Sequence, residues 1–416
     1  MELFFRIVLK FLSPRFVFSL TFSVANCFRR FLPEISNLVL QRAGEALFLE
    51  AEYTLARRCF DAVSSGKYRG FARKMTEWIA YKNGEVSLGW PRYNLKELIS
   101  TEPFVTDTVP LIVAKYELPN ELVHGLGLPR LKGEPVGELP VLVWFNFNTS
   151  LGGELLAAKV VLAWLKERSC KLILVCDPRI VSVLKTNFSH HEVISRESDL
   201  SSLRGRCQAF VLARDLLAKV VQSEADFAKI AAFDFVLPAA SRPARAQGRR
   251  KVALSWKTGN KLQGRYRNLQ LAELICVLER HNLHYISVQH GVNPAEAKLL
   301  ADRLGDRFHP VPIDTSGSVE EIAAALSALD LVVTIDNTNL HIAGAYSVPC
   351  FAMISVPSYW AWPIDGTFSR WYRSVKLIHQ RKPGCWSDVM EKLDEELKGA
   401  AWSAEREGAS GKREGR

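Results

Sequence analysis

The segment from Asp330 to Pro349 constrains the fold of this chain more than any other stretch. It reads D-L-V-V-T-I-D-N-T-N-L-H-I-A-G-A-Y-S-V-P. Its run Leu331–Ile335 is apolar and rich in β-branched residues, which predicts a strand buried on both faces of a parallel sheet. Four residues that favour turns and helix N-caps follow, and a helix pattern begins at Leu340. Because a strand leading into a helix directs several backbone N–H groups at one point, the segment predicts either a phosphate site or an ordinary capped connection.

Short apolar runs alternate with helical patterns on both sides of this segment. The predicted strands are Leu139–Phe145, Lys171–Cys176, Ala209–Ala213 and Phe235–Pro238 in a first half, and Lys251–Trp256, His284–Gln289, Leu331–Ile335 and Pro349–Ile354 in a second. The clearest helical patterns are Leu155–Glu167, Leu269–His281, Pro294–Leu304 and Ser318–Ala328. Strands connected by helices of this length predict two parallel sheets, with ligand bound off the carboxyl ends of the strands.

Four separated motifs in the second half recur in the order found in a known family. After the 336–349 segment come V-P-S-Y-W-A-W-P, W-Y-R-S-V-K-L and P-G-C-W. This order resembles the C-terminal half of the tetratricopeptide-linked glycosyltransferases related to O-GlcNAc transferase and, more distantly, the lipopolysaccharide heptosyltransferases. There, "S-V-D-N-T-x-x-H-L-A-G-A-L-G-x-P" is followed by "D-W-R-W", "S-P-W-Y-P-S-x-R-L-F" and "G-x-W". The residues that match in register are Asp336, Asn337, Thr338, His341, Ala343, Gly344, Ala345 and Pro349.

The resemblance covers about residues 140 to 395 and implies an α/β fold of the GT-B type. In that fold, two Rossmann-like parallel-sheet domains face a cleft, and the enzyme transfers a sugar from a nucleotide-activated donor. Upstream, the string A-E-Y-T-L-A-R-R-C-F-D-A-V resembles the turn and second helix of a tetratricopeptide unit. At most two such units are found, so we expect a helical cap on the catalytic domains rather than a long solenoid.

These patterns divide the chain into five parts. They are an apolar and basic amphipathic segment (1–32), a helical, tetratricopeptide-like region with a connector (33–138), an N-terminal Rossmann-like, acceptor-side domain (139–245), a C-terminal Rossmann-like, nucleotide-sugar-binding domain (246–398) and a polar tail predicted to be disordered (399–416). The basic stretch 241–251 falls between the two Rossmann-like domains and is the predicted hinge.

The net charge of +10 is concentrated in two places. Residues 1–32 carry five Lys or Arg and one Glu, which gives 5 − 1 = +4, and residues 241–251 carry +5 with no acid. Because the excess is local, no nucleic-acid partner is expected. The eight cysteines include no C-x-x-C pair, which favours a reducing compartment over a disulfide framework or a zinc site.

The first 32 residues are rich in phenylalanine and flanked by basic residues. The apolar run Phe16–Phe28 has thirteen residues, too few to cross a bilayer. Two readings stay open: an in-plane peripheral anchor at a membrane, or a helix that packs against the next helices. We therefore expect a cytoplasmic protein, with peripheral contact at the inner face of the membrane as one possibility.

The resemblance implies that three loops bind the donor. The loop Ser255–Gly259 is similar to the family's "S-W-R-G-G" or "S-W-K" loop, in which basic and small residues face the diphosphate. Lys257 would present its charge to phosphate oxygens between Trp256 and Thr258; the alternative is a solvated surface lysine. The loop Gln289-His290-Gly291 is similar to "S-L-Q-x-G". By position it would contact the base or ribose; the alternative is a tight polar turn.

The third loop begins at Asp336 and Asn337. Thr338 and Asn339 would present hydroxyl, amide and backbone N–H groups to the β-phosphate. His341, in the first helical turn, would stabilise the leaving diphosphate by hydrogen bonding or as an imidazolium; the alternative is a buried structural histidine. The chain contains no D-x-D motif, so neither a metal nor another cofactor is expected, and positive groups at the loops would take up the charge.

The acceptor side departs from the family pattern. Where the family has "G-x-G-D-E" or "S-L-G-D", this chain reads T-S-L-G-G-E, with Gly153 in place of the acid that is the usual general base. Glu154 is the remaining candidate base; the alternative is a helix N-terminal acid. The predicted function is metal-independent, inverting transfer to a cell-envelope glycan, lipid or protein. The rivals are a weakly active nucleotide-sugar-binding protein, a helical-repeat scaffold with a vestigial transferase half, and a GT-B epimerase.

Overall fold

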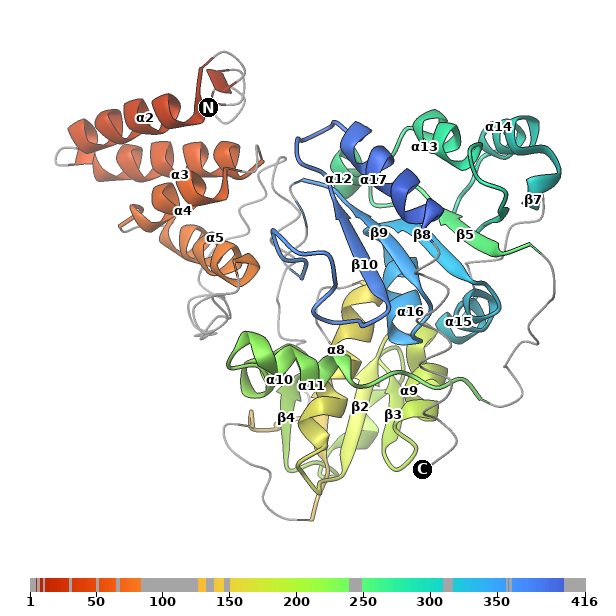
Figure 1. Cartoon of the computed structure of the whole chain (residues 1–416). Coiled ribbons are helices and arrows are strands. Elements are labelled where there is room, and N and C mark those ends of the chain that lie inside the picture. The colour runs from red at the N-terminus through yellow and green to blue at the C-terminus, as the bar shows by residue number, and fades with distance from the viewer. Residues whose placement is uncertain are drawn as a thin grey trace.

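The computed structural model describes residues 5, 8–9, 12–29, 32–49, 52–64, 68–83, 126–131, 138–145, 150–238, 249–309, 317–356, 358 and 361–399. The predicted boundary at 245–246, most of the connector at the end of the 33–138 part and nearly all of the 399–416 tail lie outside these residues. The described residues form a helical region and two parallel-sheet domains (Figure 1).

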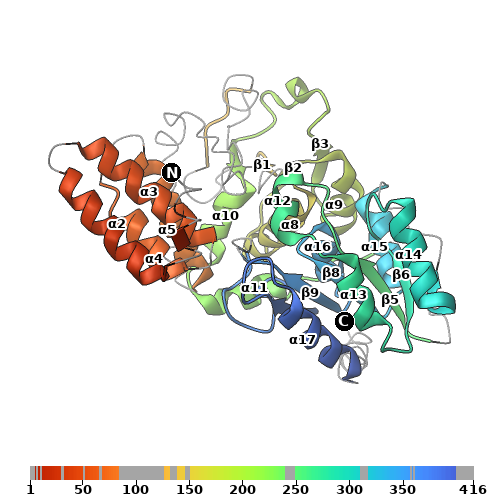
Figure 2. The same cartoon turned by 90° about the horizontal axis from the view of Figure 1, so that it is seen from above.

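The helical region consists of consecutive helices, each packed against the next along the chain. They are α2 (Pro14–Arg29), α3 (Pro33–Leu49), α4 (Tyr53–Asp61) and α5 (Arg69–Lys82). These helices share an apolar cluster of their own, separate from the clusters of the sheet domains. Helix α2 packs on α3, and the predicted boundary at residue 32 stays a prediction. Figure 2 shows the region beside the sheet domains. Its tetratricopeptide-like character stays a prediction.

The first sheet domain is a four-stranded parallel sheet in the order β3-β2-β1-β4. Its strands are β1 (Val141–Trp144), β2 (Leu172–Cys176), β3 (Glu192–Ser195) and β4 (Ala209–Leu212). Its α-helices are α8 (Leu151–Leu165), α9 (Val181–Asn187), α10 (Ala213–Val220) and α11 (Phe227–Ala231). Ser150 caps α8, because its side chain accepts a hydrogen bond from the Gly153 N–H (3.1 Å).

The second sheet domain has six parallel strands in the order β10-β9-β8-β5-β6-β7. The strands are β5 (Lys251–Ser255), β6 (His284–Ser287), β7 (Phe308–His309), β8 (Leu331–Ile335), β9 (Cys350–Ile354) and β10 (Val375–His379). The α-helices are α12 (Lys261–Arg267), α13 (Leu271–Leu278), α14 (Pro294–Leu304), α15 (Val319–Ser327), α16 (Thr338–Ala345) and α17 (Ser387–Lys398). The chain order reverses between β5 and β8, which makes their carboxyl ends the topological switch point where ligands bind in such sheets.

One predicted strand is wrong. Residues 235–238 form no strand; the Phe235 N–H instead donates to the Ala345 carbonyl (2.7 Å), and the Phe235 ring meets that of Tyr346 edge to face. This segment therefore connects the first domain to the second rather than extending the first sheet. The sequence patterns also missed β3 and β7, which are short and carry an exposed residue, and β10, which contains the half-buried Lys376 and His379.

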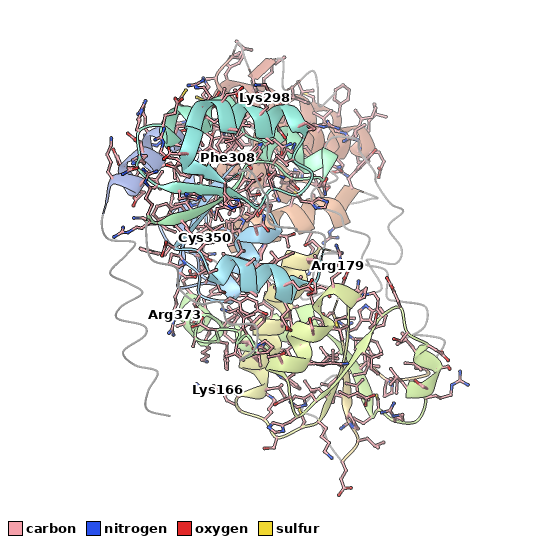
Figure 3. All side chains as sticks on the ribbon, turned by 90° about the vertical axis from the view of Figure 1, so that its right-hand side faces the viewer. Lys166, Arg179, Lys298, Phe308, Cys350 and Arg373 are labelled. Carbon is pink, nitrogen blue, oxygen red and sulfur yellow. The ribbon has the colours of Figure 1, made fainter. Side chains whose placement is uncertain are left out.

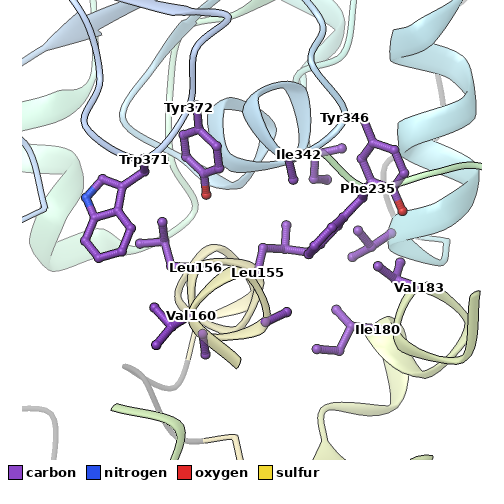
Figure 4. Packing of buried hydrophobic residues seen from close by; sticks show 14 of the residues in the cluster. Leu155, Leu156, Val160, Ile180, Val183, Phe235, Ile342, Tyr346, Trp371 and Tyr372 are labelled. Atoms are coloured by element: carbon purple, nitrogen blue, oxygen red, sulfur yellow. The ribbon is translucent and has the colours of Figure 1, made fainter. Parts of the chain in front are cut away.

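The two sheet domains pack against each other through α8 and α16. Leu155 and Leu156 of α8 are fully buried in the same apolar cluster as Ile342, Trp371 and Tyr372 of the second domain. Figure 4 shows this layer, with α8 facing the segments that carry Ile342, Trp371 and Tyr372. Burial of each such leucine contributes roughly 1.5–3 kcal/mol, so the contact fixes the start of α8 relative to β8 and α16. Figure 3 shows the domains one above the other, with Lys298 in the upper domain and Lys166 in the lower.

Candidate functional site

The loops after β5 and β8 are joined by a hydrogen-bond network at the switch point. Asn337 caps α16: its Oδ1 accepts from the Asn339 N–H (3.0 Å) and from the Thr334 hydroxyl (3.0 Å). The Asn337 Nδ2 donates to Ser255 Oγ at the end of β5 (2.8 Å). Asn339 is buried, and its Nδ2 donates to the Val288 carbonyl after β6 (2.9 Å). The side chains of Asn337 and Asn339 therefore hold the loops together.

Gln289 connects the second loop to the first. It is buried, and its Oε1 accepts from Ser255 Oγ (3.2 Å) and from the backbone N–H groups of Trp256 (2.9 Å) and Lys257 (2.8 Å). Its Nε2 donates to the carbonyl of His290, whose own side chain is exposed. The structure thus places Gln289 in a supporting role and leaves His290 as the polar side chain of this loop that faces solvent.

Lys257 is half-buried at the switch point and paired with α14. Its Nζ lies 2.5 Å from Glu296 Oε2. Burial would raise the pKa of Glu296, but the Lys257 ammonium, the Asn293 N–H and the Trp256 indole together hold that pKa below its ordinary value. Trp256 itself is fully buried, so its ring is not open to a ligand. Thr258 is half-buried, and its N–H donates to Asn268 Oδ1 (2.8 Å).

Asp336, at the end of β8, is buried beside a basic residue that the sequence patterns did not single out. The Arg267 guanidinium lies 3.1 Å from Asp336 Oδ2 and donates to the Asp336 backbone carbonyl (3.0 Å). Asp336 is therefore engaged with Arg267, and its neighbour Thr338 remains half-buried at the first position of α16.

His341 lies where the two sheet domains meet. Its ring stacks on Trp362 (centroids 5.3 Å apart), and its Nδ1 lies 3.0 Å from the Tyr372 hydroxyl. A Cβ at Gly152, in the first turn of α8, would overlap the imidazole, so only glycine permits this approach of the domains. Burial, partly offset by Asp336 and reinforced by Arg267, lowers the pKa of His341 to about 4. Its imidazole is therefore neutral at neutral pH.

Glu154 is buried in the first turn of α8 with contacts to both carboxylate oxygens. Oε1 pairs with Arg196, and Oε2 accepts the Asp177 N–H (2.8 Å). Arg196 also donates to the Phe145 carbonyl after β1 (3.0 Å). These contacts tie the start of α8 to the ends of β1 and β2, as a structural ion pair does. The assignment of Glu154 as a general base stays a prediction.

The predicted site residues thus separate into two groups. Lys257, Thr258, His290 and Thr338 are half-buried or exposed at the ends of the second sheet's strands. The supporting residues are the buried Trp256, Gln289, Asp336, Asn339 and His341, the half-buried Asn337 and, in the first domain, the buried Glu154. The patterns missed Arg267 and Glu296, whose partners are distant in sequence, and they gave no role to Trp362 or Tyr372 although both lie in the quoted motifs. Among the described residues, no three His, Cys, Asp or Glu side chains gather as metal ligands.

Comparison with known proteins gives limited matches. No family model matches the chain. It is 28% identical over 156 residues to Protein FlbA of Caulobacter vibrioides, a match that covers 37% of this chain and 26% of that protein. The chain thus matches about a quarter of the length of that relative.

Solved structures that the chain is similar to include glycosyltransferases. They include E. coli ADP-heptose lps heptosyltransferase II (11% identity, TM-score 0.43, covering 62% of this chain and 98% of that chain) and the glycosyl transferase family 9 protein of Veillonella parvula (11%, 0.41, 65% and 98%). A third is the iron-containing dodecameric glycosyltransferase TibC of enterotoxigenic E. coli (14%, 0.40, 61% and 66%). At TM-scores below 0.5 the functional assignment has to come from the site itself, and the tetratricopeptide-linked resemblance stays a prediction.

Proposed function

We propose that the chain is a glycosyltransferase of the GT-B type, which binds a nucleoside-diphosphate sugar at the switch point of the second sheet. The observation that carries the proposal is the convergence of Lys257, Thr338 and the capped N-terminus of α16 on the ends of β5 and β8. A helix N-terminus that follows a buried strand offers N–H groups and a positive dipole end to an anion. The family motifs quoted above run through the same loops.

The proposed chemistry is electrostatic. As the sugar leaves, negative charge grows on the diphosphate, and preorganised donors stabilise it without a metal. In this mechanism Lys257 exchanges Glu296 for a phosphate oxygen, and Thr338 donates its hydroxyl. His341 contributes as a neutral hydrogen-bonding group, because burial disfavours the imidazolium. The reaction is proposed to invert the anomeric centre and to deliver the sugar to a cell-envelope glycan, lipid or protein.

A second candidate function is a weakly active nucleotide-sugar-binding protein. It is favoured by the contacts of Glu154 with Arg196 and Asp177, together with glycine at position 153. Both features leave the start of α8 without an unengaged acid in its first turn. Helical-repeat scaffolding with a vestigial transferase half is the remaining alternative.

A two-stage assay separates these functions. In the first stage, thermal shifts are measured with ADP, UDP and GDP, because a ligand that binds only the native state raises the melting temperature. In the second stage, release of nucleoside diphosphate from the matching sugar donor is followed with and without cell-envelope extract as acceptor. Acceptor-dependent release is expected; binding without release would favour the binding protein, and the absence of any shift would contradict both.

We also propose that α2 makes peripheral contact with the cytoplasmic face of a membrane. Its outer surface exposes apolar side chains four residues apart: Phe16 (54% exposed), Leu20 (52%), Val24 (38%) and Phe28 (38%). The opposite face packs into the helical region, and exposed Arg15 lies beside the apolar surface. An apolar helix face bordered by basic residues fits the interface of an anionic bilayer. Of the helices in the described residues, none has the length and apolar character to cross a bilayer.

Liposome sedimentation tests this contact with substitutions that leave the buried face of α2 intact. The double variant Phe16→Ser/Leu20→Ser is expected to lose most of the binding that the wild type shows to vesicles containing phosphatidylserine. Leu299→Ser, a change at an exposed leucine of α14, serves as the control and should bind as the wild type does. Equal sedimentation of all three proteins would exclude α2 as the contact.

A further inference from the structure

The helical region places a lysine inside the second sheet domain. Lys82, at the end of α5, is 1% exposed, and its Nζ donates to Ser358 Oγ (2.5 Å) and to the Trp362 carbonyl (3.0 Å). The Ile364 N–H donates to the Lys82 carbonyl (3.3 Å), and the Tyr53 hydroxyl of α4 is hydrogen-bonded to Ser358. The helical region is therefore attached to the 358–364 segment through two of its helices.

Trp362 connects this attachment with the proposed diphosphate site. The carbonyl that Lys82 holds belongs to Trp362, and the indole of Trp362 stacks on His341 in the first turn of α16. Lys82 also interacts electrostatically with Asp336, which begins the third loop, and with Arg267, which pairs with Asp336. The amine is thus close enough to the loop after β8 for its charge to be felt there.

We propose that Lys82 is a component of the diphosphate site that the helical region contributes, and that it takes up a proton when the diphosphate binds. This inference rests on the proposed function. In this step the neutral amine gains one proton from the solvent. It becomes an ammonium, whose charge stabilises the bound anion. The helical region is then a working part of the donor site rather than only a cap beside it.

The surroundings of the amine set the direction of this response. Burial lowers the pKa of Lys82 to about 7; Asp336 opposes the shift, while Arg370 and Arg267 add to it. The other facing groups are the Tyr53 ring, 5.6 Å from Nζ, and His379 of β10, whose pKa is lowered to about 4, first by burial and then by Lys82. Near pH 7.5 a substantial share of the Lys82 amines is therefore neutral. A bound polyanion opposes the cations and raises the pKa, which draws in a proton.

Isothermal titration calorimetry tests the inference in the full chain. ADP and UDP are titrated at pH 7.5 in HEPES and in Tris, since the difference in heat between buffers of unlike ionisation enthalpy counts the protons exchanged. His341 and His379 stay neutral at this pH and contribute little. We expect the wild type to take up roughly half a proton or more per nucleotide. We expect proton uptake by Lys82→Met to be smaller by that amount, and we expect this variant to bind the nucleotide several-fold more weakly.

Tyr53→Phe is the matched control, because it removes a hydrogen bond to the same segment and leaves the amine in place. It should keep the proton uptake of the wild type. Equal uptake by the wild type and Lys82→Met would overturn the inference while leaving the proposed function intact. Wild-type binding without any uptake would overturn it too, and needs no variant. If neither nucleotide binds the wild type, the proposed function fails and the inference falls with it.

Discussion

The carboxyl ends of the two sheets are built differently. At the end of the second sheet, buried amides such as Gln289 and Asn339 hold the loops, and Lys257 and Thr338 are left half-buried beside the N-terminus of α16. At the end of the first sheet, the acid of α8 is used internally: Glu154 holds Arg196 and the Asp177 N–H. The end of the second sheet leaves polar groups half-buried on loops that are held by hydrogen bonds. The end of the first sheet uses its polar groups in internal contacts.

This difference indicates that the two sheets have different roles. A site that binds a charged ligand needs donors that are fixed in place, and the second sheet provides them in Thr338, the N-terminus of α16 and Lys257, which Glu296 holds. The described part of the first sheet supplies packing instead, through α8 and Gly152 against His341. We infer that the second sheet carries the preorganised groups for the sugar donor. The described part of the first sheet holds His341 in place.

Breaking the Glu154–Arg196 pair should have the largest effect. Arg196→Met leaves a buried carboxylate without its cation, and we expect the free energy of unfolding to fall by about 3–5 kcal/mol. Arg206→Met, which breaks the exposed pair with Glu192 on the same sheet, should cost less than about 1 kcal/mol. Urea denaturation measures both.

Glu154→Gln then separates a supporting role from a catalytic one. A general base predicts a loss of transfer of about 10²–10⁴-fold at an unchanged melting temperature. A supporting ion pair predicts a lower melting temperature with a much smaller loss of transfer per folded molecule. The first result would overturn the contrast between the two sheet ends.

Acid should weaken the junction at His341. The folded state holds the pKa of this imidazole at about 4, below its ordinary value of 6.5, so the unfolded chain binds more protons between these two pH values. The stabilising contribution of the neutral ring is present above pH 6.5 and is lost as the pH falls towards 4, by about 3 kcal/mol. Urea denaturation at pH 6.5 and 4.5 should show a smaller decrease in His341→Gln than in the wild type. His290→Gln, at an exposed histidine, should match the wild type.

A methyl group at Gly152 should separate the two domains slightly. Gly152→Ala overlaps the His341 ring, and relief of the overlap by backbone or side-chain shifts costs roughly 1–3 kcal/mol. Gly399→Ala provides the control, because a Cβ at this position after α17 would meet only ordinary van der Waals neighbours and lies outside the proposed site. Thermal unfolding and nucleotide affinity should both worsen in the first variant and stay unchanged in the second. Equal behaviour would show that the contact at His341 does not set the site.

Local sequence patterns predicted the second sheet's end well and the long-range contacts poorly. The strand Leu331–Ile335 depends on neighbouring residues, so the apolar run was sufficient to predict it. The turn residues predicted a cap within 336–339; the cap is Asn337, and α16 begins at Thr338 rather than at Leu340. The buried role of Gln289 depends on donors more than thirty residues earlier in the chain, and a lone polar residue in a loop gives no sign of them. The partners of Lys82 are still farther away in the sequence, since they are Ser358 and Trp362.

The errors in the predicted strands also have physical explanations. Glu192–Ser195 forms an edge strand with an exposed first residue and half-buried followers, so its pattern is too polar to predict a buried strand. Val375–His379 contains Lys376, whose ammonium reaches Glu396 of α17 rather than solvent alone. The reverse error at 235–238 arose because an apolar connector that packs under Tyr346 has the composition of a strand.

The affinity of Lys257→Met for nucleoside diphosphates tests the central claim most directly. Calorimetry with ADP and UDP should show binding weakened about tenfold, roughly 1.4 kcal/mol, because the ammonium is already paired with Glu296 and its net contribution is that of one charged hydrogen bond. Lys298→Met removes a lysine of α14 that pairs with Asp302 at the surface, and it should bind as the wild type does. Equal affinities in a folded Lys257→Met and in Lys298→Met would show that the diphosphate does not bind at the switch point.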